Sequence, residues 1–358
     1  EFGEGHVLSV LNEAGDGNVM LYTGLTANIA DLMIRNEQDG DFTKALREMI
    51  AAEVKAKPQM TTIGNNVRIS NVTEITDCHI ADGTVIDGAA CIKCCTLGDD
   101  PAHPVVIGKG VICHDSVIVS DSAVLDNARV ESCFVGEKST VTGGFSAEAS
   151  LFFANTFMNN GESCAAFCGP FSQSHHKGSL LIGSEMSFYN AGSSTNFSNH
   201  AYKMGPMHWG ILERGTKTAS GSHTLLPAKF GVFNVILGKI QNHPDTTDLP
   251  FSYVIAEGHD SYIIPGRNVT TVGLYRDIRK WPKRDKRKDC RTLINFDWLS
   301  PHAVNEILKG KSVLESLAKQ DKPVVEYKGS LLRQSSIAKG LRFYDLALRL
   351  YFGSLGKV

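Results

Sequence analysis

Hydrophobic residues between positions 63 and 145 return in six-residue steps. Units such as Ile63-Gly-Asn-Asn-Val67 and Ile107-Gly-Lys-Gly-Val111 open on a branched aliphatic, pass through turn-forming residues, and close on a small or β-branched residue. A helix repeats every 3.6 residues and a strand every two, so neither element alone gives this period. A short strand, a tight turn and another strand do give it. The pattern predicts a β-solenoid whose aliphatic side chains stack along one inner wall.

Some steps of the repeat are five residues long, and three of these short steps carry a cysteine at the same place. Cys78, Cys95 and Cys133 each follow one aliphatic residue by three positions and precede the next by two. We expect these cysteines to fill equivalent small inward positions. They should therefore be buried, unpaired thiols and not reactive ones.

The repeat is interrupted before it ends near Gly238. From Ser146 onward, large aromatic residues replace aliphatics; the rhythm returns between Ile182 and Gly192, breaks again over 195–209, and resumes through Ile236. Departures from a self-consistent pattern tend to be functional or strained. We therefore expect the working part of the molecule near these breaks.

Segments outside the repeat predict helices, strands and a linker. Helices are expected from Thr26, a plausible N-cap, to Asn36, and from Phe42 to Lys57, where Pro58 ends the pattern. After the repeat, strands are expected over 249–254, 260–264 and 268–272, a basic linker over 276–291, and helices over 300–319 and 337–352.

The first residues, Phe2 to Leu8, look like the tail of a hexapeptide unit. We therefore expect the chain to begin within a solenoid, with Phe2 and Val7 stacked on the coil of Ile63 or an adjacent one. The expected divisions are 1–18, the end of an upstream coil; 19–60, a helical insertion; 61–240, the β-helix with inserted loops; 241–290, a strand extension and basic linker; and 291–358, a carboxy-terminal helical segment.

These units resemble the hexapeptide-repeat superfamily, whose members coil as left-handed parallel β-helices. The resemblance implies a mainly β fold, a left-handed parallel β-helix with amino- and carboxy-terminal helical attachments. The handedness comes from the resemblance alone, because the general rule for parallel crossovers predicts a right-handed one. Most enzymes of this superfamily are acyltransferases that use an acyl-coenzyme A as co-substrate, and they are commonly trimers. A homo-oligomer, with a trimer favoured, is therefore expected.

Composition argues against several classes of protein but does not indicate a particular reaction. The 358-residue chain has a formal net charge of −2, which gives no overall attraction to nucleic acid or to an anionic membrane. No apolar run is long enough for a membrane span. The nine cysteines are an odd number, and several occupy core-like positions, so a reducing cytoplasm is expected and a disulfide framework is not.

Candidate catalytic and substrate-binding residues gather between Ser172 and His223. Acyl transfer needs a base that takes the proton of the acceptor, and histidine is poised for that near neutral pH. It also needs a donor for the carbonyl oxyanion, which Asn, Lys or a backbone N–H can supply. The polar residues of this stretch are His175, His176, Asn190, Asn199, His200, Lys203, His208, Trp209 and His223. The plain alternative is that these side chains only satisfy backbone groups at solenoid turns.

Part of this stretch resembles the acetyltransferase half of bifunctional UDP-N-acetylglucosamine pyrophosphorylases. Ala191-Gly192, Asn199-His200 and Lys203 match in order an Ala-Gly turn, an Asn-Tyr pair and a lysine of that family. The resemblance implies that Asn199 and Lys203 contact the acceptor or acyl group and that Ala191 lies near the donor. Its catalytic histidine has its nearest counterparts in His175 and His176, and His200 replaces the family's tyrosine. The base stays open among these three histidines. The chain also resembles large bacterial hexapeptide-repeat proteins of unassigned activity.

We expect one shared site, in which Asn199, His200 and Lys203 face His175 or His176 across a cleft. A bound acceptor could bridge groups separated by up to about 10 Å while keeping each within hydrogen-bond reach. Coenzyme A phosphates would then contact the basic tail that follows the solenoid, at Arg267, Arg276, Arg279 and Lys280.

Other functions have weaker support in the sequence. No His-x4-His spacing occurs, and Cys91-Ile-Lys-Cys94 lacks a distant CxxC partner, so no metal is expected. The single basic patch lacks a stacking platform for nucleic acid beyond Trp281. A non-catalytic solenoid scaffold or binding protein remains the alternative to the acyltransferase. A third hypothesis, the solenoid half of a sugar-nucleotide enzyme, finds no glycine-rich nucleotidyltransferase loop.

Overall fold

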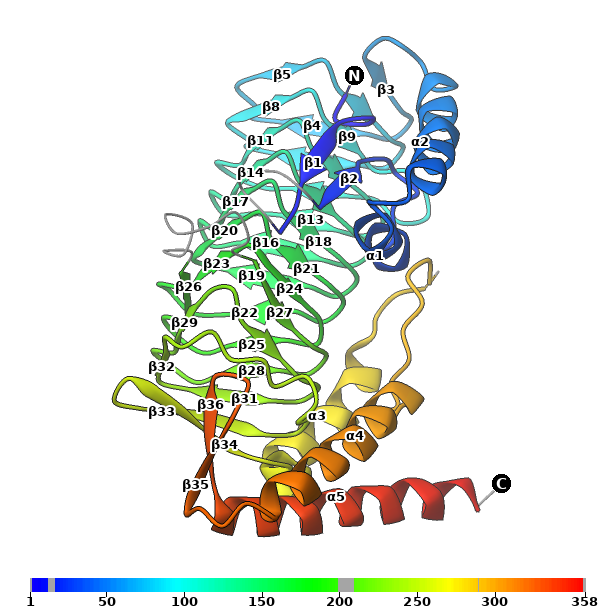
Figure 1. The fold of residues 1–358 in the computed structure, drawn as a ribbon. Helices are drawn as coiled ribbons and strands as arrows, with labels where there is room; N and C mark the ends of the chain where they lie inside the picture. Colours follow the sequence, from blue (N-terminus) through cyan, green and yellow to red (C-terminus); the bar gives the residue numbers. More distant parts are fainter. Residues whose placement is uncertain (1, 12–16, 199–208, 289, 357–358) are drawn as a thin grey trace. The chain divides into compact units, whose positions relative to one another are not determined.

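The computed structural model describes residues 2–11, 17–198, 209–288 and 290–356 (Figure 1). The chain divides into two compact units. The amino-terminal unit comprises residues 1–184 and 286–293, and the carboxy-terminal unit comprises residues 185–285 and 294–358.

The described part of the amino-terminal unit contains a β-solenoid with three parallel sheets, in which each strand pairs with the strand one coil further on (Figure 1). Its first sheet consists of β3 (Thr62–Ile63), β6 (His79–Ile80), β9 (Thr96–Leu97), β12 (Val117–Ile118), β15 (Phe134–Val135), β18 (Leu151–Phe152) and β21 (Phe167–Cys168). Its second sheet consists of β4 (Arg68–Ser70), β7 (Val85–Asp87), β10 (Val106–Ile107), β13 (Ala123–Val124), β16 (Thr140–Thr142), β19 (Phe157–Asn159) and β22 (Gln173–Ser174). Its third sheet consists of β5 (Ile75–Thr76), β8 (Cys91–Lys93), β11 (Ile112–His114), β14 (Arg129–Glu131), β17 (Ser146–Glu148), β20 (Glu162–Cys164) and β23 (Leu180–Ile182).

The usual coil of this unit is 17 residues long, the separation between Thr62 and its partner His79. Two steps of six and one of five make this length, so the mixed periods in the sequence are the three sides of one coil. The pairing of Thr96 with Val117 spans four residues more. The extra residues belong to the loop 98–104, which leaves the solenoid at this corner.

Each five-residue step is a corner that contains a residue with left-handed backbone, such as Asp77 with a φ of 52°. At most of these corners, the residue that follows is a cysteine or serine whose side chain donates to the carbonyl two positions earlier; Ala166, after the left-handed Ala165, has no such donor. This bond is made by Cys78 to Thr76 (3.1 Å), Cys95 to Lys93 (3.0 Å) and Cys133 to Glu131 (3.1 Å). Serine hydroxyls make the same bond at equivalent corners, from Ser116 to His114 (2.6 Å), Ser150 to Glu148 (2.8 Å) and Ser184 to Ile182 (2.9 Å).

The expectation for the three corner cysteines is confirmed. Cys78, Cys95 and Cys133 are fully buried and form no disulfide. Burial raises the pKa of Cys133 to about 12 and that of Cys95 well above its ordinary value. These thiols are therefore structural hydrogen-bond donors.

The core is a set of stacked columns inside the coils. Along the first sheet, one column places equivalent residues directly above one another: Ile80, Leu97, Ile118, Val135, Phe152 and Cys168. All of them are buried. The sequence becomes irregular where Phe152 enters this column, yet the strand register continues unchanged. An edge-on contact between the rings of Phe145 and Phe152, with centroids 6.2 Å apart, lets aromatic residues fill the same space.

The solenoid of this unit is flanked by a hairpin and two helices. The strands β1 (Val7–Ser9) and β2 (Asn18–Met20) pair antiparallel. The helix α1 (Ala27–Arg35) lies within its predicted range, and α2 (Gly40–Lys55) begins and ends two residues earlier than predicted. Thr26 caps α1 by accepting from the amide of Ile29.

The first residues run over the solenoid without joining its sheets. The Phe2 ring packs 4.0 Å from the His79 ring, and the Phe2 carbonyl accepts from Thr96, so Phe2 stacks beside the coil of Ile63 as expected. Val7 lies instead in the antiparallel hairpin and is 40% exposed, which differs from the prediction. Its partner is Met20 because a hairpin satisfies the backbone of this segment locally.

The carboxy-terminal unit continues in the same kind of coil and then changes to mixed structure. Its parallel strands also form three sheets. The first sheet has β24 (Ser184–Met186, beginning at the last residue of the other unit), β27 (Gly210–Leu212) and β30 (Lys229–Phe230), and the second has β25 (Asn190–Ala191), β28 (Lys217–Thr218), β31 (Val235–Leu237) and β33 (Tyr253–Glu257). The third sheet has β26 (Asn196–Ser198), β29 (His223–Leu225) and β32 (Lys239–Ile240). The remaining elements are β34 (Asp260–Ile264), which is antiparallel to β33, the 3-10 helix η2 (Arg267–Thr270), α3 (Val272–Arg284), α4 (Pro301–Ala318), the antiparallel pair β35 (Val324–Tyr327) and β36 (Ser330–Arg333), and α5 (Gln334–Leu355).

Two of the expected elements in this unit are wrong. The segment 268–272 forms η2 and the start of α3 instead of a strand, because the buried Asn268 side chain donates to the Phe233 carbonyl and fixes a turn. The basic linker is the helix α3. The helices α4 and α5 agree with the predicted ranges to within a few residues. Within the described residues, no helix has the length and hydrophobicity that a bilayer crossing requires.

The burial of the corner cysteines predicts their chemical reactivity. In the native protein, a polar maleimide should label the exposed Cys290 rapidly and leave Cys78, Cys95 and Cys133 unmodified, because reaction requires an accessible thiolate. Mass spectrometry of tryptic peptides before and after denaturation measures this. Rapid native labelling of all three corner cysteines would contradict the fold.

The shared corner geometry predicts which substitutions Cys133 tolerates. Cys133→Ser should lower the free energy of unfolding by less than about 1.5 kcal/mol, because Ser116 and Ser150 make the same bond at neighbouring corners. Cys133→Leu should cost more, about 3 kcal/mol, because it overpacks the corner and removes the donor. Urea unfolding of the two variants compares them. An equal loss in both variants would show that the thiol's hydrogen bond and size do not matter.

Candidate functional site

The helix α3 forms where a linker is expected because it has a narrow buried face. Thr271 caps it by accepting from the amide of Leu274, and Pro282 lies in its last turn. Its buried residues are Leu274, Asp277 and Trp281. Because one of these buried residues is an aspartate, the sequence of this segment does not show the hydrophobic periodicity of an amphipathic helix. The helix therefore presents most of its basic residues to solvent.

Aromatic contacts anchor α3 within the carboxy-terminal unit. The Trp281 ring meets the Phe188 ring edge-on at 4.8 Å and lies 6.1 Å from the Phe233 ring. Phe233 in turn stacks on Phe251 at 5.0 Å. Such contacts add stability beyond the buried area. They hold the helix in one position over the coils.

An ion pair between Lys217 and Asp277 joins β28 to α3. Asp277 also faces the Arg276 guanidinium, with Nε 3.5 Å from its carboxylate. Burial, together with the positive charges of Arg276 and Lys280, lowers the pKa of Lys217 to about 8. The ammonium is still protonated at pH 7. One carboxylate therefore faces more than one cation.

The cations on α3 are crowded. Partial burial, followed by repulsion from Arg284 and Arg276, lowers the pKa of Lys280. The side chain of Arg276 is 68% exposed, so this surface is open to solvent. A bound anion would relieve the mutual repulsion, and guanidinium groups bind phosphate oxygens in a bidentate manner. We call Lys217, Arg276, Lys280 and Arg284 the basic face.

Another cation, Arg214, is half-buried in the corner that precedes Lys217. Its guanidinium carbon lies 4.1 Å from the centre of the Phe188 ring. Burial lowers the pKa of Arg214 to about 10, and the Asp297 charge opposes this. Its Nε and Nη2 atoms are buried and have no hydrogen-bond partner among the described residues. Buried donors without a partner are costly, so a water molecule or an anion would satisfy them.

The structure brings together part of the predicted site. Asn190, a predicted substrate-binding residue, pairs in register with Lys217, and Ala191 follows it as a buried residue of the same strand. The charges of Arg276 and Lys280, two of the predicted donor-binding residues, act on Lys217, which pairs with Asp277 of the same helix. The second-sheet side of the coil and α3 therefore form one candidate site.

Other predicted residues of this unit lie apart from that cluster or bind local partners. His223 is in β29 of the third sheet, paired in register with Asn196 and Lys239. Trp209 is half-buried just before β27.

Arg267 and Arg279, two further residues predicted to bind the donor, engage their own neighbours. Arg267 donates to Thr270 at 3.1 Å, and Arg279 donates to the Tyr275 hydroxyl at 2.6 Å. We therefore place neither arginine in the basic face.

The predicted catalytic residues remain untested by the geometry. His175 and His176 are exposed residues of the amino-terminal unit, where His175 lies 3.1 Å from the Gln173 amide oxygen and stacks on Phe157 at 5.0 Å. Asn199, His200, Lys203 and His208 lie outside the described residues. The shared site that was to join these two groups stays a prediction. Among the described residues, no group of three or more His, Cys, Asp or Glu side chains is arranged to hold a metal ion.

Sequence reasoning missed four residues of the site: Arg214, Lys217, Asp277 and Arg284. A weak signal existed for the first two, because charged residues stand at 214 and 217 within the six-residue pattern between Ile211 and Thr218. Asp277 gave no signal, because an aspartate in a basic run looks like part of a solvated segment.

Comparisons with known proteins place the chain in a family and add no site residues. No curated protein matches the sequence. Among solved structures, the chain is similar to the UDP-N-acetylglucosamine acyltransferase of Francisella novicida, with a TM-score of 0.29 and 10% sequence identity over 74% of this chain and 86% of that one. The family model described as "Domain of unknown function (DUF4954)" matches residues 1–318. Because that match spans most of the chain, the protein belongs to the DUF4954 family.

Proposed function

We propose that the protein is an acyltransferase of the hexapeptide-repeat type, which moves an acyl group from an acyl-coenzyme A to a sugar, nucleotide-sugar or amino acceptor. The observation that carries the proposal is the basic face beside Asn190 and Ala191. There, burial and then repulsion from neighbouring cations lower the pKa of Lys217 and of Lys280. Coenzyme A carries its charge on phosphate groups, which are the ligands that such a surface favours.

In this proposal the donor lies along α3 with its phosphates on Arg276, Lys280 and Arg284. Asp277 keeps Lys217 oriented beside Asn190, and the donor's acyl end lies near the strand that contains the buried Ala191. The buried N–H groups of Arg214 would donate to an anionic or carbonyl oxygen that reaches the corner. The resemblance of the 191–203 stretch to the acetyltransferase pattern supports the same placement.

The chemistry needs one base and one leaving group. A histidine, with His175, His176 and His200 as candidates, takes the proton of the acceptor hydroxyl or amine. The acceptor oxygen or nitrogen then attacks the thioester carbonyl, and the oxyanion is stabilised by an amide or ammonium donor. When the tetrahedral intermediate collapses, the carbon–sulfur bond breaks and the sulfur of coenzyme A leaves with a proton from the imidazolium. We propose that the working form is a homotrimer, as the resemblance implies.

The alternative is a scaffold that has the solenoid but lacks catalysis. The exposure of His175 and His176, with His175 against Phe157 and Gln173, favours it. A base works best in a site that excludes water, whereas these rings lie on the surface. Binding and turnover must therefore be measured separately.

Charge reversal on α3 tests donor binding. Arg276→Glu and Lys280→Glu should each weaken coenzyme A binding about tenfold, because each change replaces an attraction of about 1 kcal/mol by a repulsion. Isothermal titration calorimetry at low and high salt measures this. Lys239→Glu is the matched control, since it makes the same charge change at an exposed position on the third sheet. Equal affinity in all three variants would remove the basic face from the proposal.

Histidine variants test catalysis. Among His175→Ala, His176→Ala and His200→Ala, the variant that removes the base should lower coenzyme A release by a factor of about 10² to 10⁴ while binding is retained. A thiol-trapping assay with acetyl-coenzyme A and a panel of amino sugars and sugar nucleotides provides the rate. His243→Ala is a control for loss of a surface histidine. Tight coenzyme A binding with no turnover in the wild type would favour the scaffold.

A further inference from the structure

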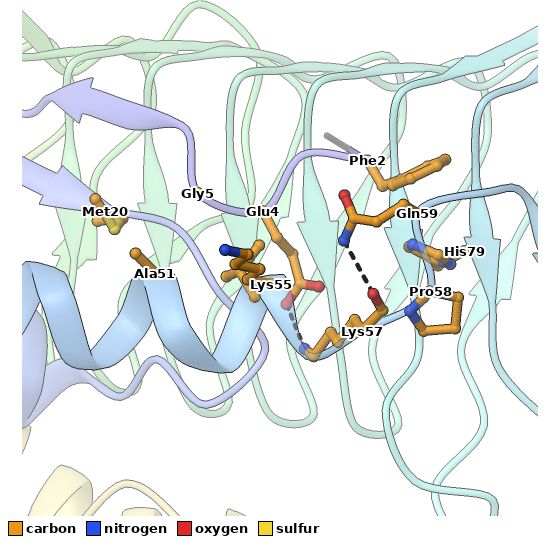
Figure 2. A pocket seen from close by; sticks show the side chains of 11 residues that line it. Phe2, Glu4, Gly5, Met20, Ala51, Lys55, Lys57, Pro58, Gln59 and His79 are labelled. Atoms are coloured by element: carbon orange, nitrogen blue, oxygen red, sulfur yellow. Dashed lines mark hydrogen bonds and ion pairs between the residues drawn. The ribbon is translucent and has the colours of Figure 1, made fainter.

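A pocket in the amino-terminal unit lies between the first residues of the chain, the end of α2 and the coil of β6 (Figure 2). Its volume is about 250 Å³, which is enough for a small organic molecule. Phe2 and Glu4 form one wall, Val54 and Lys55 of α2 form another, and His79 lies at one end. None of the candidate acyltransferase residues lines it, so a function for this pocket is independent of the proposed transferase.

The polar groups that form the pocket are held rigidly. Glu4 is only 3% exposed; its carboxylate accepts from the Thr23 amide at 2.8 Å and from the Lys57 ammonium at 2.6 Å. Figure 2 shows Glu4 reaching from the amino-terminal segment to Lys57, across the space between the two walls. Gln59 donates to the Lys57 carbonyl at 2.9 Å, which fixes the chain as it leaves α2. The shape of the pocket is therefore preorganised.

The charges around the pocket are unbalanced. The Glu4–Lys57 ion pair is neutral as a unit. His79 does not add a charge, because burial lowers its pKa and keeps the imidazole neutral at pH 7. Lys55 also lines the pocket and makes no ion pair with any described residue. The lining therefore carries one excess positive charge, which favours an anionic ligand.

Apolar surface covers the rest of the pocket. The Phe2 ring is 9% exposed and lies against the His79 ring, and Met20 and Val54 contribute aliphatic surface. Binding sites for small molecules combine such apolar lining with a few fixed polar groups. A flat, unsaturated or short-chain body fits between these side chains, with its charged end toward Lys55.

We propose that this pocket binds a small organic monoanion, with an aromatic or short alkyl body and a carboxylate or sulfonate end. The ligand bridges the amino-terminal segment, α2 and β6, three parts that are separate in sequence. Its binding therefore stabilises the packing of the flanking elements on the solenoid, because a ligand that binds only the folded state shifts the unfolding equilibrium.

The fluorescent sulfonate 1-anilinonaphthalene-8-sulfonate serves as the probe for the full chain. One equivalent should bind; benzoate should displace it, and benzylamine, a cation of nearly the same shape, should not. Displacement by both compounds alike would overturn the proposed charge preference. Binding of many weak equivalents that benzoate does not displace would show general adsorption to apolar surface and would overturn the site.

Matched substitutions on α2 locate the binding. Val54→Trp fills the pocket and should weaken probe binding at least tenfold, whereas Met49→Trp, at a 56% exposed position of the same helix outside the pocket, should leave it within twofold. Lys55→Glu should weaken probe binding about fivefold, because that factor corresponds to the free energy of one exposed ion pair. Lys44→Glu, outside the pocket, should not weaken it. Unfolding midpoints check that the variants fold. If Val54→Trp does not fold, the Lys55→Glu and Lys44→Glu pair decides, and equal affinity in these two overturns the proposal.

Discussion

Coil-to-coil backbone pairing is the constraint on which the rest of this structure depends. Each short strand forms backbone hydrogen bonds on both sides only if the two neighbouring coils place their own strands beside it in register. Every coil must therefore turn at equivalent positions. In the amino-terminal unit the five-residue corner meets this requirement with a left-handed residue, seen at Asp77, Ser132 and Ala149. The thiol or hydroxyl that follows then gives the corner carbonyl a second hydrogen bond, beside the one from a backbone amide of the next coil.

This constraint explains why insertions occur where they do. The loop 98–104 leaves the solenoid at a corner and returns before Val106, so that β10 still pairs with β7 and β13. An insertion within a strand would shift every later side chain between the inner and outer faces. Larger core residues such as Phe152 are tolerated for the same reason, because they change the width of a coil without changing its register. The repeat can therefore vary in the length of its corners and in the volume of its core side chains.

A solenoid wall is nearly flat, and a binding site needs convergent groups. In the carboxy-terminal unit α3 supplies them, since Trp281 anchors the helix on Phe188 while Asp277 reaches Lys217. In the amino-terminal unit the pocket arises in a comparable way, where Glu4 and α2 stand over the first sheet near His79. In both cases an element outside the coils brings convergent side chains to a repetitive surface. The chemistry of the molecule therefore depends on its attachments as much as on its repeat.

The sequence by itself determined the repeat, the inward cysteines and most of the helices, because these depend on neighbours within one coil or one helical turn. A left-handed corner before Cys78 and a capping Thr26 are local features, and local features appear as spacing. The tertiary structure alone decided that 272–284 is a helix, that Val7 lies in a hairpin, and that Lys217, the register partner of Asn190, pairs with Asp277 of α3. The Lys217–Asp277 pair spans 60 residues, and nothing in the spacing of either residue identifies the other. Such pairs form only after the coils have stacked and α3 has docked, so their electrostatics cannot be predicted from the order of residues.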